Sequence, residues 1–328
     1  MEKRSFCTGV RNELVAIKER EGDFAAFISG VIRGAGELVF TFKGFGLTIR
    51  HADEGFVKKT VEIINNLTGE KYEYYDSFLD LGYSKKTFFT LNVPVESAAS
   101  LLEKCAVVRN RCELIDEIPA ELVKTSGAKK AYLRGLFLAC GYLGVPQEID
   151  EWVKVKTRSG YSMEFNLNSS IVIEDVKKLL TKVAKLDKDA VRIRTKSNVV
   201  YVRNSDALGA CLTAIGSVKG TLALNEIIAE RQMKNDINRV NNFDLANIDK
   251  SLSASEKQLE DIATIEEVMG LDRLPPQLRD TCYMRRKYPD AGLEELGTLF
   301  VPPVGKSGIN HRMRRIAEIA KEARQREE

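Results

Sequence analysis

The fold is decided by two short stretches that match each other, ISGVIRGAG at residues 28–36 and LRGLFLACG at residues 133–141. Both are largely apolar, and each has glycine at its third and its last position. Small residues within a helix, such as Gly30 and Gly34, allow the backbone of a second helix to approach closely. We therefore expect two buried helices, at residues 23–35 and 128–140, that pack against each other.

The ends of these helices carry residues that favour capping. Asp23 and Ser126 have the short polar side chains that are preferred at the N-terminal cap of a helix. Gly36 and Gly141 suit a C-terminal cap in the left-handed region, which glycine adopts without steric cost. Asp23 and Ser126 are thus expected to start the two helices, and the glycines to end them.

The same order of elements follows both helices. Hydrophobic alternation predicts strands, and a period of 3.6 residues predicts helices. In the first copy, strands are expected at residues 38–42, 46–51, 71–76 and 87–93, and helices at residues 54–67 and 95–105. In the second copy, strands are expected at residues 152–157, 162–167, 191–195 and 199–203, and helices at residues 171–186 and 206–215. Two αββαββα copies predict an α+β fold in which similar modules form a pseudo-symmetric pair.

Both leading helices resemble the LAGLIDADG helix of homing endonucleases. Enzymes of that family place an acidic residue before the final glycine, so that two carboxylates hold divalent metals for phosphodiester hydrolysis. Here the positions are Ala35, which has no ligand atom, and Cys140, whose soft thiol magnesium does not favour. Glu37 lies beyond the first helix and cannot replace a symmetric pair. We expect no catalytic residue, metal or cofactor, and no enzyme activity; a metal-dependent homing endonuclease or maturase is the alternative.

The second module carries basic residues at alternating positions. They are Lys154, Lys156 and Arg158 in one predicted strand and Arg192, Arg194 and Lys196 near another. Period-two spacing places each set on one face of a sheet, where it can follow a row of phosphates. The alternative is an ordinary solvated face. This is a secondary candidate for a DNA contact.

A change of composition marks a domain boundary. After Thr221 the sequence becomes a long polar helix rich in asparagine, and residues 253–256 then fit a capping box that opens a new helix ending at Gly270. We expect one module at residues 1–110, a second at residues 111–224, a helical linker at residues 225–251 and an all-α domain at residues 252–328.

The all-α domain has the layout of a helix-turn-helix. Pro275 and Pro276 open a helix that runs to about Tyr288, a short amphipathic helix follows at residues 293–300, and residues 301–305 form a turn. The last helix, at residues 306–323, has an apolar stripe formed by Ile309, Met313, Ile316 and Ala320. Such a stripe faces the core and leaves the opposite face for a DNA groove.

That opposite face is basic. No aspartate or glutamate occurs between Leu299 and Ala317, so cations and the helix dipole act together at the start of the helix. Side chains near the start of this helix are expected to contact base edges, and its arginines are expected to contact guanines or phosphates. The predicted DNA-binding residues are Lys306, Ser307, Asn310, His311, Arg312, Arg314 and Arg315.

Composition sets broad limits on location and chemistry. The 328 residues carry a net charge of +3, which neither requires nor excludes a nucleic-acid partner. The N-terminal stretch is charged throughout and no run of about 18 apolar residues follows, so we expect a cytoplasmic protein without a membrane contact. The six cysteines are scattered without a C-x-x-C pair, and no disulfide is expected. His51 and His311 are too few for a His/Cys metal site.

Three longer stretches resemble the WhiA family of bacterial regulators. They are LRGLFLACGYLGVP at residues 133–146 with the downstream MEFNL at residues 163–167, INRVNNFDLANIDKSLSASEKQLEDI at residues 237–262, and LPPQLRDTCYMRRKYPDAGLEELGTLFVPPVGKSGINHRMRRIAEIA at residues 274–320. The resemblance implies a degenerate LAGLIDADG region joined to a sigma-factor-like helix-turn-helix. It also implies a role in sporulation control or in cell division and chromosome segregation.

Three hypotheses of function follow. The first is a nucleoid-associated transcription regulator that binds double-stranded DNA and, through its LAGLIDADG-like region, another transcription or division protein. The second is the nuclease or maturase, which Ala35 and Cys140 argue against. The third is a chromosome-associated protein whose sheet binds a partner.

Overall fold

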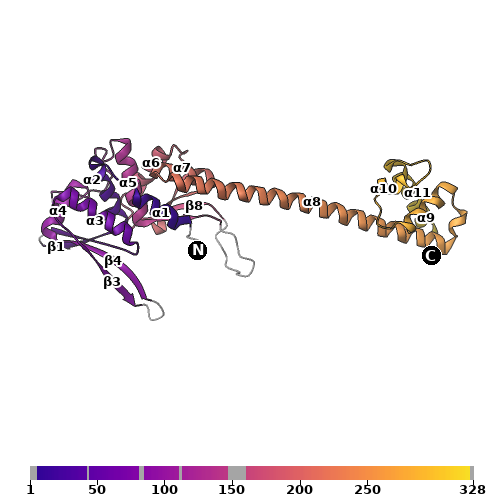
Figure 1. Ribbon diagram of the computed structural model, residues 1–328, viewed down its shortest axis with the longest axis horizontal. Helices are drawn as coiled ribbons and strands as arrows, with labels where there is room; N and C mark the ends of the chain where they lie inside the picture. Colours follow the sequence, from indigo (N-terminus) through magenta and orange to yellow (C-terminus); the bar gives the residue numbers. More distant parts are fainter. Residues whose placement is uncertain (1–5, 43, 81–84, 111–112, 147–159, 326–328) are drawn as a thin grey trace. The chain divides into compact units, whose positions relative to one another are not determined.

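The computed structural model describes the chain except for residues 1–5, 43, 81–84, 111–112, 147–159 and 326–328. The chain divides into two compact units, residues 1–230 and residues 231–328 (Figure 1). One helix, α8 (Val218–Val268), runs from the first unit into the second.

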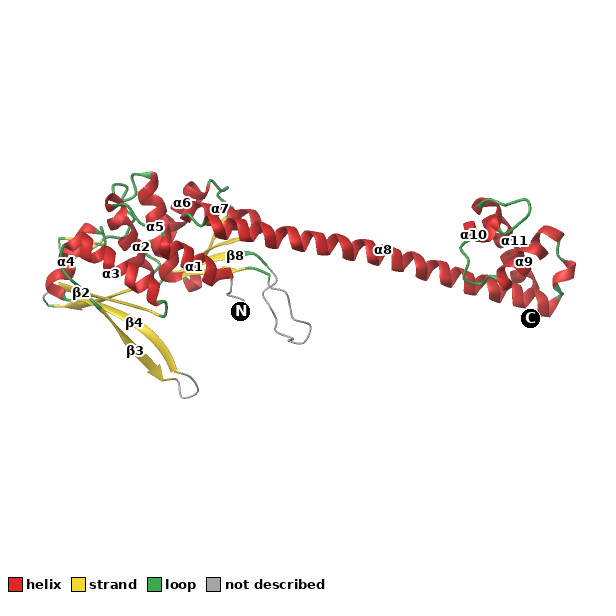
Figure 2. Ribbon diagram, in the orientation of Figure 1, coloured by secondary structure: helices red, strands yellow, loops and turns green. Residues whose placement is uncertain are grey.

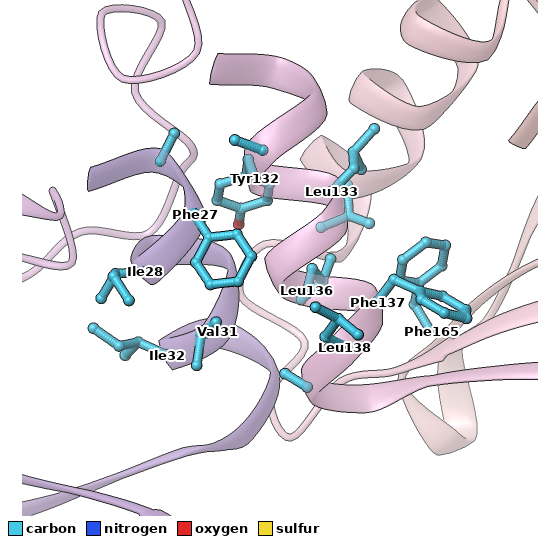
Figure 3. Packing of buried hydrophobic residues seen from close by; sticks show 14 of the residues in the cluster. Phe27, Ile28, Val31, Ile32, Tyr132, Leu133, Leu136, Phe137, Leu138 and Phe165 are labelled. Atoms are coloured by element: carbon cyan, nitrogen blue, oxygen red, sulfur yellow. The ribbon is translucent and has the colours of Figure 1, made fainter. Parts of the chain in front are cut away.

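The first unit is built around a pair of helices, α2 (Phe24–Ala35) and α5 (Ser126–Cys140), which lie side by side (Figure 3). A Cβ atom at Gly30 would overlap the Tyr132 carbonyl oxygen, and one at Gly135 would overlap the Phe27 carbonyl oxygen. Only glycine permits this reciprocal backbone contact, because any side chain would push the helices apart. The predicted close packing of the two motif helices is confirmed.

The predicted caps of these helices are confirmed in position for Asp23, Gly36 and Gly141, but not in their geometry. Asp23 occupies the N-cap position of α2 but makes no capping hydrogen bond. It is the last residue of a short 3₁₀ helix (Glu21–Asp23), and Thr125 Oγ1 donates to its carboxylate at 3.4 Å. Thr125, not Ser126, caps α5 by accepting from the Ala128 amide at 2.9 Å. Gly36 and Gly141 are extended, with φ of −74° and −79°, because each begins a strand instead of a left-handed cap.

Two four-stranded antiparallel sheets repeat one topology. In the first, β1 (Gly36–Thr41), β2 (Gly44–His51), β3 (Tyr74–Asp80) and β4 (Lys85–Val93) have the order β1-β2-β4-β3. In the second, β7 (Gly141–Gly144), β8 (Ser162–Asn166), β9 (Val191–Arg194) and β10 (Val199–Arg203) have the order β7-β8-β10-β9. The equal orders confirm the internal repeat. The predicted strand at residues 152–157 lies outside the described residues, and β7 pairs with β8 directly after α5.

Helices cover one face of each sheet (Figure 2). They are α3 (Glu54–Thr68) and α4 (Val95–Lys104) in the first module, and α6 (Ile173–Ala184) and α7 (Ser205–Ile215) in the second. The strands turn alternate apolar side chains toward these helices, for example Leu47 and Ile49 in β2 and Val200 and Val202 in β10, all of which are buried. The other face of each sheet mixes polar side chains, such as Thr48 in the first sheet and Glu164 in the second, with exposed Tyr75 and Tyr142. A two-residue pair, β5 (Val108–Arg109) with β6 (Glu113–Leu114), follows α4.

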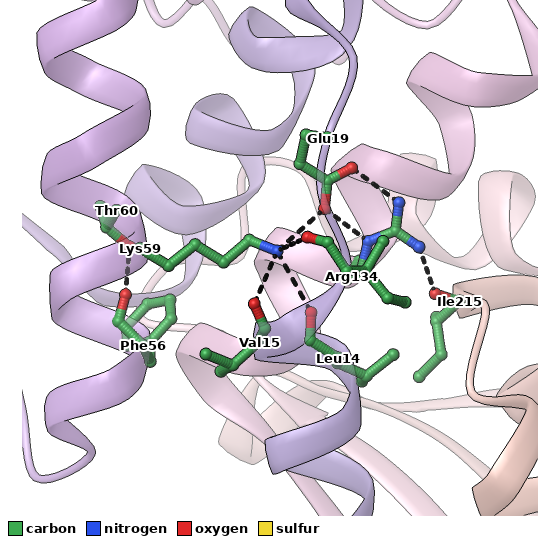
Figure 4. A network of polar contacts seen from close by, with 9 residues as sticks. Leu14, Val15, Glu19, Phe56, Lys59, Thr60, Arg134 and Ile215 are labelled. Carbon is green, nitrogen blue, oxygen red and sulfur yellow. Dashed lines mark hydrogen bonds and ion pairs between the residues drawn. The ribbon is translucent and has the colours of Figure 1, made fainter.

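An unpredicted N-terminal helix, α1 (Phe6–Ala16), ties the modules together through a buried ionic network (Figure 4). The Glu19 carboxylate accepts two hydrogen bonds of 2.7 Å from the Arg134 guanidinium of α5 and lies 3.3 Å from Lys59 Nζ of α3. Lys59 also donates to carbonyls at the end of α1, and Arg134 donates to Ile215 O at 2.6 Å. The charges are tolerated because each is paired and hydrogen-bonded.

The helix α8 is continuous over 51 residues, so the predicted restart at residues 253–256 is wrong. Ser255 Oγ does not cap a new helix but donates to Pro289 O of the second unit. That unit continues with α9 (Pro276–Lys287), α10 (Leu293–Thr298) and α11 (Lys306–Arg324). Among the described residues, no helix is long and apolar enough to cross a membrane.

Candidate DNA-binding site

One apolar stripe holds α11 on the second unit. Ile309, Met313, Ile316 and Ala320 are all buried, as their spacing predicted. They pack with residues from the end of α8, from α9 and from α10, among them Ile262, Ile265, Leu278, Cys282 and Leu296. The opposite face of α11 is therefore turned away from the core.

A close backbone approach fixes the turn before α11. A Cβ atom at Gly297 would overlap the Val304 carbonyl oxygen, and the Val304 amide donates to Gly297 O at 3.0 Å. Gly305 follows at the N-terminal cap and offers no capping side chain. The first amides of this 19-residue helix are thus open to an external acceptor, which suits a phosphate.

The structure separates the seven predicted DNA-binding residues into two groups. Exposed on α11 are Lys306, Ser307, His311, Arg314 and Arg315, whereas Asn310 and Arg312 are half-buried. Arg312 donates to Thr281 Oγ1 at 3.5 Å, and its guanidinium carbon lies 5.4 Å from the centre of the Phe300 ring. Arg312 thus braces α11 against α9 and the turn, a contact that its sequence position did not indicate.

Over residues 306–317 the charges on α11 are all positive. The first acidic residue of α11 is Glu318, which pairs with Arg315 at 2.6 Å. Both side chains are more than half exposed, so water screens the pair and a phosphate can compete for the guanidinium at little cost. Within the described part of the chain, Lys306 and Arg314 have no ion-pair partner.

The ends of α2 and α5 form the second site of interest, because the resemblance to the LAGLIDADG motif predicts metal-binding carboxylates there. The Cys140 thiol donates to Leu136 O at 3.3 Å, and burial raises the pKa of this thiol to about 12. It is therefore protonated at neutral pH and a poor metal ligand. In the described part of the chain, no three His, Cys, Asp or Glu side chains form a metal-binding group.

The positively charged side chain of Arg11 lies at the C-terminal end of α5. The Arg11 guanidinium of α1 donates to Leu138 O and, at 3.3 Å, to Gly141 O, and it lies 3.1 Å from Nε2 of His51. Burial, together with the nearby Arg11 charge, lowers the pKa of His51 to about 4, so this imidazole is neutral at pH 7. A fixed guanidinium satisfies carbonyls at the helix end and complements the helix dipole.

The predicted basic face of the second sheet is present only in part. Lys154, Lys156 and Arg158 lie outside the described residues. Arg192 and Arg194 are exposed on β9, and Lys196 is exposed in the 3₁₀ turn after it instead of on the strand. Arg194 lies 3.9 Å from Glu164, a carboxylate near the middle of this face, which partly offsets the positive charge.

The same face presents two tyrosines that sequence reasoning missed. Strand register places Tyr142, Glu164, Tyr201 and Arg192 in one row across β7, β8, β10 and β9. The guanidinium groups of Arg194 and Arg203 lie 5.1 Å and 5.2 Å from the centre of the Tyr201 ring. Alternation within VVYVR at residues 199–203 could have indicated Tyr201 and Arg203, whereas nothing near Arg11 in the sequence indicates its contact with α5.

Comparison with known proteins gives the family. Residues 129–234 match the model of the WhiA LAGLIDADG-like domain, and residues 237–320 match that of the WhiA C-terminal HTH domain. A probable cell division protein WhiA from Thermoanaerobacter sp. (strain X514) is 34% identical, over 98% of this chain and 99% of the relative. The chain belongs to the WhiA family. A WhiA relative from Clostridium tetani (strain Massachusetts / E88) is 33% identical, over 97% of this chain and 98% of the relative.

A solved WhiA structure has the same fold. Full-length DUF199/WhiA from Thermatoga maritima superimposes with a TM-score of 0.55 and 21% sequence identity, covering 97% of this chain and 99% of the other. At this identity the likeness concerns the fold alone. It confirms the predicted α+β architecture of LAGLIDADG-like modules followed by helices, and the WhiA resemblance seen in the sequence is confirmed as membership of the family.

Proposed function

We propose that this chain is a DNA-binding transcription regulator whose helix α11 enters the major groove. The observation that carries this proposal is the exposed half of α11, which combines Lys306, Arg314 and Arg315 with uncapped amides and no acidic residue before Glu318. Ser307, His311 and Asn310 lie near the helix start, where base contacts concentrate in this motif. The arginines further along α11 are assigned to phosphates or guanines.

The LAGLIDADG-like region is proposed to bind a partner and not to cleave DNA. Ala35 and a protonated Cys140 stand where nuclease chemistry needs two carboxylates. The Arg11 guanidinium already occupies carbonyls at the end of α5, which disfavours a second cation there. This region is assigned to a partner protein of transcription or division, and Arg192, Arg194 and Lys196 are its secondary candidates for a DNA contact.

The proposed process is sporulation control or cell division with chromosome segregation, carried out at the nucleoid. The relatives described as probable cell division proteins WhiA support the second of these processes.

A footprinting experiment with and without Mg²⁺ or Mn²⁺ tests the proposal. Genomic fragments selected by the full-length chain are end-labelled and probed for protection and for strand scission. A defined protected site without scission supports the regulator. Specific cleavage that is lost in Glu37→Gln would establish the nuclease instead. Diffuse or absent protection would favour a chromosome-associated protein that acts through protein partners.

A further inference from the structure

A hollow on the helical side of the second module is lined by lysines over an apolar floor. Its volume is about 390 Å³, and it lies between the segment before α5 and helix α6. Ile118, Val123 and Leu179 provide the floor. The cations at its margin are Lys124, Lys129, Lys178 and Lys182.

The wall of this lysine pocket is fixed by Asp175. The Ile118 amide donates to Asp175 Oδ2 at 3.1 Å, and Lys178 Nζ donates to Oδ1 at 3.2 Å. Both carboxylate oxygens are thus engaged, and Asp175 balances the charge of Lys178. The pocket is therefore held in shape by a hydrogen bond between segments that are distant in sequence.

The remaining lysines leave the rim positively charged. Lys124 lies 3.7 Å from Glu121, but both side chains are more than three-quarters exposed and the pair is weak. Lys129 Nζ donates to a backbone carbonyl, that of Lys124, at 3.5 Å. Within the described part of the chain, Lys182 has no ion-pair partner. An excess of positive charge around an apolar floor calls for an occupant with the opposite charge and an apolar group.

We propose that the lysine pocket docks an acidic segment of a partner protein, with one aliphatic or aromatic side chain anchored on Val123 and Leu179. A small free anion would meet only exposed or half-buried ammonium groups, whose attraction water screens. A protein segment would instead cover the floor and the rim together. The apolar floor then shields the anchoring side chain of the partner from water, and the lysines attract the acidic residues of the segment as it approaches.

The position of the pocket is compatible with simultaneous DNA binding. Helix α6 packs through Val176 and Leu180 beneath the sheet, whereas Arg192 and Tyr201 lie on the opposite sheet face. The proposal assigns a site to the partner-binding role proposed above. Its test uses no promoter DNA, so its failure would leave the DNA-binding proposal standing.

The test first selects short random peptides, displayed on phage, that bind the immobilised full-length chain. Labelled synthetic copies of the enriched peptides are then titrated with the full-length chain, and binding is measured by fluorescence anisotropy. We expect enrichment of aspartate and glutamate around an aliphatic or aromatic residue. Lys124→Glu combined with Lys182→Glu should weaken binding by about tenfold. Lys130→Glu combined with Lys177→Glu makes the same charge change outside the pocket and should alter binding by less than about twofold.

Two further measurements keep the outcome decisive if a variant folds poorly. Binding to the wild-type chain should weaken as salt rises, and Val123→Ser should weaken it without changing that salt dependence. Absence of acidic enrichment, equal losses in both charge-reversal variants, or salt-independent binding would overturn the proposal. Displacement of the peptide by inorganic phosphate would assign the pocket to a free anion, and displacement by duplex DNA would assign it to nucleic acid; either result would also overturn it.

Discussion

Arg314 and Arg315 lie on α11 away from its buried stripe, so their role in DNA binding can be separated from folding. Arg314→Ala and Arg315→Ala should each weaken DNA binding while leaving thermal unfolding unchanged. Loss of one phosphate contact should lower the salt slope by about one unit for every sequence. Loss of a bidentate guanine contact should cost about 1–3 kcal/mol and relax preference at one base pair.

A salt titration on a mapped site, by electrophoretic mobility shift or anisotropy, distinguishes these two roles. Lys321→Ala, an exposed cation on the far part of α11, is the matched control. If the double variant Arg314→Ala with Arg315→Ala kept wild-type affinity and salt dependence, α11 would not be the principal DNA reader. Arg192 and Arg194 of the second sheet would then become the leading candidates.

Gly135 sits where α5 touches the backbone of α2, and no side chain fits there. Gly135→Ala places a methyl group against the Phe27 carbonyl oxygen, so we expect the free energy of unfolding of the first unit to fall by about 1–3 kcal/mol. Denaturant unfolding of the full chain measures this loss. Gly9→Ala in α1 is the control, because a Cβ atom at Gly9 meets nothing within 4 Å. Equal stability of Gly135→Ala and wild type would contradict the packing described here.

At the scale of elements, α1 fixes the start of α8. The Glu13 carboxylate accepts from Ser217 Oγ at 2.6 Å and from the Lys219 and Gly220 amides at 2.8 Å and 3.0 Å. Burial acts to raise the pKa of Glu13, but these hydrogen bonds and one from the Val218 amide outweigh it and lower the pKa below the usual 4.5. A carboxylate at a helix N-terminus is also favoured by the helix dipole.

The lowered pKa predicts how this cap depends on pH. The contribution of the Glu13 carboxylate to stability is complete above pH 4.5, the pKa of this carboxyl in the unfolded chain. It is lost as the pH falls through the lower pKa that the carboxyl has in the folded chain. Glu13→Gln should therefore cost about 1 kcal/mol at pH 7, and the difference from wild type should shrink in acid. Chemical denaturation across this pH range checks it, with Glu226→Gln on the exposed side of α8 as control. A difference that is constant with pH would mean that charge is not involved.

At the scale of the whole molecule, the two compact units have separate cores. The first core extends from Val10 to Leu224, and the second combines the end of α8 with α9, α10 and α11. A fragment of residues 1–230 should therefore melt cooperatively without the rest of the chain. The complementary fragment of residues 231–328 should retain binding to a mapped DNA site.

Calorimetry measures the melting of the fragment of residues 1–230, and fluorescence anisotropy measures DNA binding by the fragment of residues 231–328. The matched comparison is the intact chain, whose melting should contain both transitions. A non-cooperative transition of the first fragment would show that its core needs the second unit. Loss of DNA binding by the second fragment, with its helix content intact, would place essential contacts in the first unit.

The internal repeat, the helix pair and the buried stripe of α11 can all be predicted from the sequence. Each of these depends on local periodicity or on glycine at a fixed spacing, which neighbouring residues reveal. The sequence also located Ala35 and Cys140, because the motif fixes their positions relative to Gly36 and Gly141.

The features that join distant segments depend on contacts that form in the folded chain. Gly141 begins a strand because β8 is available to pair with it, and the Ser255 hydroxyl donates to Pro289 O instead of capping a helix. The contacts of Arg11 with α5 and of Asp175 with the lysine pocket likewise span many residues. Contacts with residues distant in sequence can override the local preference of a residue for a helix cap or a strand start. The free energy of those contacts cannot be inferred from the neighbouring residues alone.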